Sequence, residues 1–303
     1  MDISLVICSF NRAAMLGPML EHLACQRIPD GMAWEIVVVD NRSSDDTPKV
    51  IEEATARTGL PIRYVYEGRA GHGIARNAGT ANSRGEIVAF TDDDVFPSAD
   101  WLANILREFR ADPELAALGG RVELHDLRDL PVTIRTCTSR YRLRGVEDLM
   151  NGPIGCNMAF RRSVLSALGG FDADFGAGAP LPSHEDTELL FRALQTGCKV
   201  CYVPDVLVFH NHGRRTEEDL DALTKRYVLG RGAMYAKHIL RRDGAMLRMA
   251  YWELRNETKR AIVGMIALRF RNRSAAVVYY LVAGGLRLVC TRCERALTRL
   301  RSG

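Results

Sequence analysis

The chain has 303 residues, of which 47% are hydrophobic and 26% are charged. This composition excludes a disordered protein and allows one large α/β domain with an appendage, or two modest domains. The net charge of +4 hides an asymmetry, because residues 1–210 contain 21 basic and 29 acidic side chains whereas residues 211–303 contain 20 and 8. The basic final third predicts a polyanionic partner, either nucleic acid or an anionic membrane surface.

The N-terminus, the apolar stretches and the cysteines favour a cytoplasmic protein. The chain enters a strand-like run directly, without a basic leader or a cleavage site, so we expect no secretory signal. The longest apolar stretch, Ala275–Leu286, is shorter than the roughly 20 residues of a membrane-spanning helix, and we expect no span. Two C-x-x-C pairs lie too far apart in sequence for a compact zinc module, so we expect reduced thiols at Cys198, Cys201, Cys290 and Cys293.

Strand-like and helix-like segments alternate through the first 110 residues. Four short apolar runs are typical of buried strands, and each is followed by a segment with helical periodicity. The expected strands are Ile3–Ser9, Trp34–Val39, Ile62–Tyr66 and Glu86–Thr91, and the expected helices cover 12–26, 48–58, 73–82 and 101–110. This alternation predicts an α/β fold with a Rossmann-like, mostly parallel sheet flanked by helices on both faces.

The alternation stops after residue 110. Further strands are expected at Leu115–Leu124, Gly155–Phe160 and Lys199–His210. An irregular charged stretch covers 126–150 and a helix covers about 185–196. From Thr216 onward the pattern is helical, amphipathic and basic. We therefore divide the chain into an α/β domain over 1–215 and a basic helical region over 216–303.

Three consecutive aspartates, Asp92, Asp93 and Asp94, follow the fourth expected strand. Carboxylates this close repel one another, and their pKa values rise unless a cation binds. Mg²⁺ or Mn²⁺ shared with substrate phosphates supplies such a cation, whereas a solvated acidic turn before the next helix is the alternative. Because ligands of parallel sheets bind beyond the carboxyl ends of strands, and Asp40 ends the second strand at that edge, we favour the metal site.

Polar residues after the first two strands suit a nucleotide. Asp40 can accept hydrogen bonds from a base or a ribose, although a plain turn residue is the alternative. Ser9, Asn11 and Arg12 end the first strand with groups suited to the same ligand. These positions are therefore candidate substrate-binding residues.

Later segments supply candidates for catalysis and metal binding. Arg76 replaces the third glycine of an incomplete G-x-G-x-x-G pattern, and we expect it to contact the nucleotide or the aspartate run. Asp186 leads the apolar face of the helix over 185–196, which suits a general base, although acids also favour a first helical turn for electrostatic reasons. His210 and His212 end the last strand, where they either complete a metal site or serve a structural role.

Taken together, these segments resemble the family 2 glycosyltransferases, inverting enzymes with the GT-A fold. The resemblance covers about residues 2–212 and is carried by an ordered series of motifs: SLVICSFNR, EIVVVDNRSSDDT, GHGIARNAGTANSRGEIVAFTDDDV, GPIGCNMAFRRSVLSALGGFD and HEDTELLFRALQTGCKVCYVPDVLVFH. The chain departs from the family at Cys8–Arg12, where most members have Pro-Thr-Tyr-Asn-Arg or similar.

The resemblance implies a role for each candidate residue. Asp40 would bind the base and ribose of the donor, Asp92 and Asp94 would form the D-x-D pair, and Asp186 would be the general base. Asp94 would be the direct metal ligand, while His210 or His212 would contact the metal or the diphosphate. The substrate-binding group implied in this way also includes Asp93, Asn157 and Glu185.

The implied reaction is metal-dependent transfer of one sugar, because the Q-x-x-R-W motif of the processive synthases is missing. A UDP-sugar is the favoured donor, and a saccharide or a polyprenyl-linked sugar of bacterial cell-surface polysaccharide synthesis is the expected acceptor. The alternatives are a sugar-1-phosphate nucleotidyltransferase, whose glycine-rich loop is absent after the first strand, and an inactive nucleotide-binding scaffold at the membrane.

The C-terminal region combines apolar and basic stripes. Apolar residues recur along one side of residues 246–265, with Arg248, Arg255 and Lys259 beside them, and further arginines follow from Arg269 to Arg301. Such helices favour an anionic membrane surface, and we expect a peripheral protein on the inner face of the plasma membrane. A helical subdomain that packs on the body or in a homodimer is the alternative. We expect no nucleic-acid partner, because no recognised motif appears.

Overall fold

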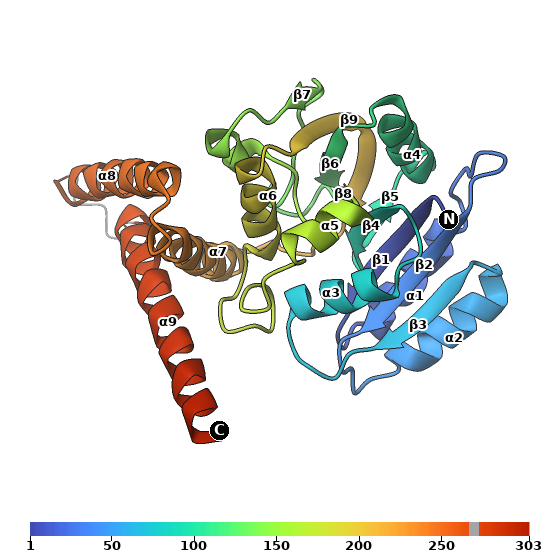
Figure 1. The fold of residues 1–303 in the computed structure, drawn as a ribbon, viewed down its shortest axis with the longest axis horizontal. Coiled ribbons are helices and arrows are strands. Elements are labelled where there is room, and N and C mark those ends of the chain that lie inside the picture. The colour runs from blue at the N-terminus through green and yellow to red at the C-terminus, as the bar shows by residue number, and fades with distance from the viewer. Residues whose placement is uncertain (267–272, 303) are drawn as a thin grey trace. The chain divides into compact units, whose positions relative to one another are not determined.

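The computed structural model describes residues 1–266 and 273–302. The chain forms two compact units, whose elements are labelled in Figure 1. The first unit contains Met1–Ala173 and Asp186–Arg215. The second contains the segment Asp174–Glu185 and the residues from Thr216 onward. The segment Asp174–Glu185 thus belongs with the helices that follow Thr216 and not with the α/β domain expected over 1–215.

The first unit is built on one sheet covered by helices. Its strands are β1 (Ile3–Ser9), β2 (Trp34–Asp40), β3 (Ile62–Tyr66), β4 (Ile87–Asp92), β5 (Val95–Pro97), β6 (Leu115–Leu124), β7 (Tyr141–Arg142), β8 (Met158–Arg161) and β9 (Lys199–His210). Its helices are α1 (Ala13–Leu23), α2 (Thr47–Thr58), α3 (His72–Asn82), α4 (Trp101–Ala111), the 3₁₀ helix η1 (Val146–Asn151), α5 (Arg162–Leu168) and α6 (Glu185–Gln195).

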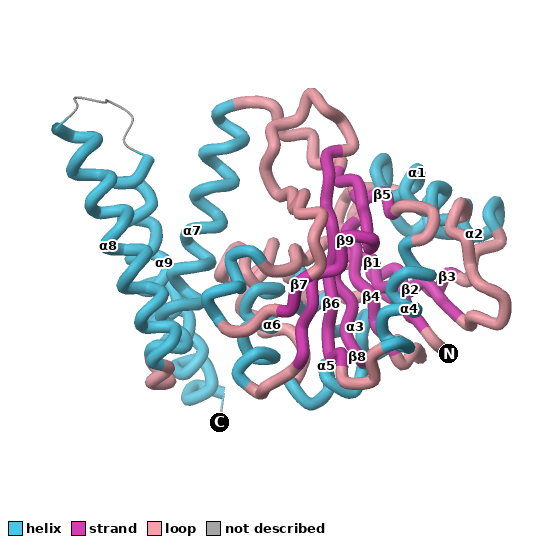
Figure 2. Tube along the Cα trace, turned by 90° about the horizontal axis from the view of Figure 1, so that it is seen from above, coloured by secondary structure: helices cyan, strands magenta, loops and turns pink. Residues whose placement is uncertain are grey.

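The strands lie side by side in the order β3-β2-β1-β4-β8-β6-β9-β5, and β7 pairs with β9 (Figure 2). Strands β3, β2, β1 and β4 are parallel, as the βα alternation predicts. Strand β8 runs antiparallel between β4 and β6, so the remainder of the sheet is mixed. The beginning of β8 therefore lies near the carboxyl end of β4, where Phe90 pairs with Met158.

Successive residues of β1 point to opposite faces of the sheet, and both faces are covered. Ile3, Leu5 and Ile7 belong to a buried cluster with side chains of α1, α2 and α4. On the other face, α3 packs so closely that a Cβ added at Gly79 would lie 2.3 Å from Val6 Cγ1. Glycine at this position lets the helix approach the sheet.

The sequence predicted the long elements well and missed the short ones. Strands β1, β3, β6 and β9 have the expected bounds. The strand expected from Gly155 begins at Met158 instead, because Asn157 donates its backbone N–H to Ile154 O at 2.9 Å and so closes a turn. Strands β5 and β7 and helix α5 were not predicted.

The second unit contains α7 (Glu217–Ile239), α8 (Gly244–Ile266) and α9 (Arg273–Ser302). Thr216 and Asp219 form a reciprocal capping box that begins α7. Glycines allow α7 and α9 to touch backbone to backbone, since a Cβ at Gly232 would lie 2.0 Å from Leu281 O. Met265, at the end of the expected apolar stripe over 246–265, lies outside the residues whose side chains are described. The same holds for five of the arginines expected between Arg269 and Arg301: Arg269, Arg271, Arg273, Arg299 and Arg301.

Helix α9 differs from the expectation of a short apolar stretch. The helix continues through Arg287, and Ser274–Arg295 is long and apolar enough to cross a membrane by length and composition, with a mean hydropathy of 1.5. Only 22% of the most apolar window within this segment is buried. Length therefore no longer excludes a spanning segment, although a core helix of a soluble protein meets the same criterion.

Candidate active site

The carboxyl ends of three parallel strands form the floor of the site. Ser9 at the end of β1 pairs with Asp40 at the end of β2, and Cys8 pairs with Asp92 at the end of β4. This register arises because all three strands begin together and carry continuous apolar runs. The structure thus places Ser9, Asp40 and Asp92 at one edge, as the sequence analysis predicted.

Arg12 links the first strand to the aspartate run. Its guanidinium lies 3.1 Å from Asp93 Oδ1 and donates to Asp94 Oδ2 at 2.8 Å. Ser9 Oγ donates to the other oxygen of Asp93 at 2.7 Å. Burial raises the pKa of Asp93 to about 7 despite these two contacts. Asp93, one of the expected substrate-binding residues, is therefore tied to the protein and only partly ionised at neutral pH.

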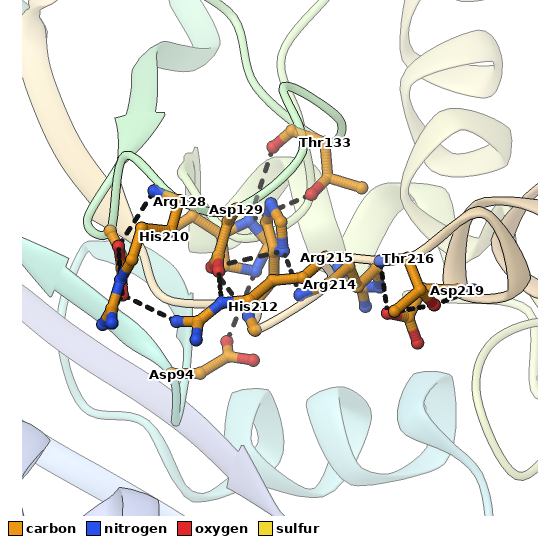
Figure 3. Close-up of polar contacts among 12 residues, drawn as sticks. Asp94, Arg128, Asp129, Thr133, His210, His212, Arg214, Arg215, Thr216 and Asp219 are labelled. Atoms are coloured by element: carbon orange, nitrogen blue, oxygen red, sulfur yellow. Dashed lines mark hydrogen bonds and ion pairs between the residues drawn. The ribbon is translucent and has the colours of Figure 1, made fainter.

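Asp94 faces His210 across the junction of β5 and β9 (Figure 3). His210 Nε2 lies 3.5 Å from Asp94 Oδ1, and Asn211 donates its N–H to Asp94 O at 2.8 Å. Burial alone would raise the pKa of Asp94, but His210 and Arg12 outweigh it and lower that pKa. Burial alone would lower the pKa of His210, but its contact with Asp94 raises it. Each of the two buried groups therefore stabilises the charged form of the other.

His212 points to a different partner (Figure 3). Its Nδ1 lies 3.6 Å from Asp129 Oδ2 and accepts a hydrogen bond from the backbone N–H of Arg214 at 3.0 Å. Asp129 also accepts from Arg215 Nε at 2.8 Å and from the N–H of Gly213. These contacts tie the end of β9 to the loop after β6. Of the two expected metal-binding histidines, only His210 thus faces the aspartate run.

Asp40 is buried and hydrogen-bonded on both oxygens. Its Oδ1 accepts from the N–H of Ser43 at 2.7 Å, and its Oδ2 accepts from Tyr64 Oη at 2.9 Å. Partial desolvation of the hydroxyl group and this hydrogen bond raise the pKa of Tyr64 to about 12. Asn11 supports the same loop, since its Oδ1 accepts from the N–H of Ser44 at 2.7 Å. Tyr64 was not predicted from the sequence. Its position near the end of the strand next to that of Asp40 could have indicated the contact.

Arg76 contacts the aspartate run and is almost completely buried. Its Nη2 donates to Asp92 Oδ1 at 3.1 Å and to Gly155 O at 2.8 Å. The guanidinium also lies over the rings of Phe90 and Phe171. Of the two expected contacts, the structure shows the one with Asp92. His72 Nε2, a contact not predicted from the sequence, lies 3.6 Å from the same oxygen.

Asp186 lies in the first turn of α6, where the backbone of Gly155 holds its side chain. Gly155 donates its N–H to Asp186 Oδ2 at 2.8 Å, and Thr187 donates its own N–H to Oδ1 at 2.7 Å. Gly155 thus contacts both Asp186 and Arg76, and it brings Asp186 into the neighbourhood of Asp92. Glu185 is buried as the last residue of the segment grouped with the second unit.

Asn157 has a structural role instead of the expected substrate contact. Its side chain is fully buried, and its Oδ1 accepts from Trp101 Nε1 at 2.9 Å. Its Nδ2 donates to Arg121 O at 3.0 Å and to Val206 O at 2.8 Å. Both amide hydrogens and the oxygen are therefore used within the protein, where they join β8 to β6, β9 and α4.

The chemistry of the aspartate run fits a divalent cation. Within residues 1–266 and 273–302, no three His, Cys, Asp or Glu side chains stand in an arrangement that holds a metal ion by itself. Asp92, Asp94 and His210 nevertheless offer the oxygen and imidazole donors that Mn²⁺ accepts, and substrate oxygens complete such sites. The run already attracts a cation, since Arg12 bridges Asp93 and Asp94.

With this geometry in place, comparison with known proteins identifies the class. Residues 4–169 match the model of Glycosyl transferase family 2, and residues 87–290 match that of Glycosyl transferase family group 2. The first match covers more than half of the chain. The chain belongs to glycosyl transferase family 2 and is a glycosyltransferase.

Two curated proteins illustrate the relationship. The chain is 27% identical over 210 residues to the succinoglycan biosynthesis protein ExoM of Rhizobium meliloti, which covers 69% of this chain and 66% of ExoM. It is 31% identical over 173 residues to the dodecaprenyl-phosphate galacturonate synthase of Rhizobium johnstonii, which covers 55% of this chain and 50% of that protein. The matched part thus spans about two thirds of ExoM and half of the galacturonate synthase.

Solved structures establish the fold. The mannosyltransferase PcManGT from Pyrobaculum calidifontis, in complex with GDP-Man and Mn²⁺, superposes with a TM-score of 0.66 at 23% identity and covers 95% of this chain and 86% of its own. S. aureus TarS 1–349 in complex with UDP-GlcNAc superposes with a TM-score of 0.60 at 18% identity, covering 78% and 66%. The predicted GT-A fold is confirmed.

Proposed function

We propose that the protein transfers one sugar from a nucleotide-sugar donor to a hydroxyl group of a saccharide or polyprenyl-linked acceptor, with inversion at the anomeric carbon. The observation that carries the proposal is that Asp186 reaches the carboxyl edge of the sheet. Asp186 and Asp92 are connected there through Gly155 and Arg76. A carboxylate beside a diphosphate-binding edge is the arrangement that a single in-line displacement requires.

Asp186 acts as the general base in this proposal. Its carboxylate accepts the proton of the acceptor hydroxyl while the hydroxyl oxygen forms a bond to the anomeric carbon. The bond from that carbon to the diphosphate oxygen breaks at the same time, and its electron pair leaves with the nucleoside diphosphate. Hydrogen bonds from Gly155 and Thr187 fix the orientation of the carboxylate before the reaction.

The aspartate run and Arg12 hold the leaving group. Asp94 and His210, with Asp92, would bind Mn²⁺ or Mg²⁺, and that ion when bound neutralises charge on the departing diphosphate. Arg12, half-exposed beside Asp93 and Asp94, is a second cation within reach of the phosphates. Mn²⁺ accompanies the nucleotide sugar in the PcManGT complex, which supports the choice of cofactor.

Asp40, Ser9 and Asn11 belong to the nucleoside side of the same edge. Tyr64 and Ser43 fix Asp40, so its remaining lone pairs have defined directions. The solved relatives carry GDP-Man and UDP-GlcNAc, and we favour a UDP-sugar for this chain. A thermal-shift screen of UDP-, GDP-, dTDP- and CDP-sugars with Mn²⁺ or Mg²⁺ tests the proposal. One donor is expected to raise the melting temperature in a metal-dependent way, and no response to any of the four would contradict a donor site here.

Two observations favour an acceptor that is linked to a membrane lipid. One relative is a dodecaprenyl-phosphate galacturonate synthase. Within the second unit, α8 exposes Leu247, Tyr251 and Trp252, and Arg255 lies over the Trp252 ring at 4.8 Å. Exposed aromatic and basic side chains together suit an anionic bilayer surface. We propose that this helical unit binds the inner face of the plasma membrane, where a lipid-linked acceptor would lie.

A further inference from the structure

The buried guanidinium of Arg76 contacts Asp92 on one side and the backbone that holds Asp186 on the other. Arg76 is only 2% exposed, so its charge requires partners within the protein. On one side it donates to Asp92, which belongs to the diphosphate edge. On the other it donates to the carbonyl of Gly155, whose N–H holds Asp186. One side chain thus connects the donor half and the acceptor half.

Gly155 leaves no space between Arg76 and Asp186. A Cβ added at Gly155 would lie 2.6 Å from Asp186 Oδ2 and 2.9 Å from Arg76 Nη1. Both atoms therefore lie within about a van der Waals contact of one point, and the carboxylate and the guanidinium are near neighbours. Any larger residue would push one of them away. The glycine in this turn is required by the approach of two charged side chains.

Two aromatic rings also restrict the position of the Arg76 guanidinium. The guanidinium lies 5.9 Å from the centroid of Phe90 in β4 and 5.5 Å from that of Phe171. These two rings pack edge to face at 5.2 Å. Cation–π contact with both rings and the planar fork of arginine restrict the orientation of the donors. A lysine cannot reproduce that geometry.

We propose that Arg76 is a positioning residue that fixes Asp186 relative to Asp92 through Gly155. It does not touch the nucleotide. The inference rests on the proposed role of Asp186 as the base and adds the element that sets its distance from the leaving group. A shift of about 1 Å in such a pair costs on the order of 100-fold in rate.

The test compares Arg76→Gln and Arg76→Lys with a matched control, Arg161→Gln. Arg161 likewise donates to backbone carbonyls, those of Leu115 and Phe109, and lies over a phenylalanine ring at 5.2 Å. It sits at the opposite end of the sheet, where it pairs with Ile87 at the start of β4. Both arginines therefore have similar structural roles, and only Arg76 adjoins the reacting groups.

Both Arg76 variants are expected to lower kcat by about 10- to 100-fold while the donor KM changes less than about threefold. Arg161→Gln is expected to lower the melting temperature without changing kcat of the folded enzyme. Gly155→Ala keeps the arginine side chain but crowds both Arg76 and Asp186. It is expected to give the same loss of kcat, and it keeps the test decisive if the arginine variants do not fold. A raised donor KM with unchanged kcat would instead show a nucleotide contact and overturn the inference.

Failure of the inference and failure of the proposed function are distinguishable. If Asp186→Asn abolishes transfer but the Arg76 variants and Gly155→Ala keep the wild-type kcat, the base assignment stands and the positioning role is wrong. If Asp186→Asn transfers sugar normally, the proposed base is wrong, and the inference falls with it whatever the Arg76 variants do.

Discussion

Three adjacent aspartates occupy three different environments at the end of β4. Asp92 faces Arg76 and His72, Asp93 is bound by Ser9 and Arg12, and Asp94 faces His210. Burial raises the pKa of Asp93 to about 7, whereas His210 and Arg12 lower the pKa of Asp94 against the effect of burial. Neighbouring residues of one motif therefore differ in charge and in the ligand that they can hold.

This difference predicts unequal effects of two matched substitutions. Asp94→Asn is expected to weaken Mn²⁺-dependent binding of the nucleoside diphosphate by about 10-fold or more, because it removes a charged metal ligand. Asp93→Asn is expected to change the affinity by less than about threefold, since Asp93 is already bound to Ser9 and Arg12 and is only partly ionised at neutral pH. Isothermal titration calorimetry with and without Mn²⁺ measures both. Equal losses would show that the two carboxylates share the metal.

Asn157 gives a prediction about stability. Asn157→Ala removes three hydrogen bonds, two of them fully buried, and takes this partner from Trp101 Nε1 and from the carbonyls of Arg121 and Val206. We expect the free energy of unfolding to fall by about 2–4 kcal/mol. Asn104→Ala, which removes an exposed hydrogen bond to Asp205 O, is the control and is expected to cost less than about 1 kcal/mol. Urea unfolding checks both, and an unchanged midpoint for Asn157→Ala would refute the structural role.

At the scale of elements, the sequence predicted the strands that are visible as local patterns of apolar residues. Runs rich in apolar residues identify β1, β3, β6 and β9. The ends of β1, β2 and β4 locate Ser9, Asp40 and Asp92 at one edge. The turn at Gly155 and the insertion of β8 between β4 and β6 depend on contacts between distant segments. Sequence spacing carries no signal for them, so the partnership of Gly155 with Asp186 and the structural role of Asn157 were not predictable.

The beginning of α6 makes folding stability sensitive to pH. Burial lowers the pKa of His184 to about 3, so the folded state keeps this imidazole neutral. The unfolded chain binds the proton below about pH 6.5, and stability is therefore lost as the pH falls from 6.5 toward 3. We expect a contribution of up to about 1 kcal/mol per pH unit over that window.

His184→Asn is expected to flatten this dependence. Asparagine has no titrating group and tolerates the positive φ of 73° at this position. Chemical unfolding at pH 7, 6, 5 and 4 compares the slope of the free energy of unfolding for the two proteins. Parallel slopes would mean that other groups account for the acid sensitivity.

At the scale of the whole molecule, the carboxylates of the site and the excess of basic side chains lie in different parts of the chain. The carboxylates of the site belong to the first unit, and the second unit carries the excess of arginine. Helix α9 adds exposed apolar side chains to those of α8, among them Tyr279, Val282 and Leu286. Such a surface is unusual for a monomer in water and is typical of a membrane or protein contact. Its basic flanks favour the membrane.

Flotation with liposomes tests this division. The full chain is expected to float with phosphatidylglycerol vesicles and to remain below with phosphatidylcholine vesicles, and 0.5 M salt is expected to weaken the binding to the anionic vesicles. Replacing Tyr251 and Trp252 by serine is expected to reduce flotation several-fold. Leu127→Ser, at an exposed leucine of the first unit, is the control and is expected to have no effect. Unreduced flotation of the double variant would contradict membrane contact through α8.

The role of Asp186 is the central claim about the reaction, and one variant tests it most directly. Asp186→Asn preserves the size and one hydrogen-bond acceptor of the side chain but removes the base. The metal-dependent affinity for the donor is expected to stay within about threefold of wild type, while kcat for sugar transfer falls by about 1,000-fold or more. Normal transfer by Asp186→Asn would show that another residue takes the proton of the acceptor.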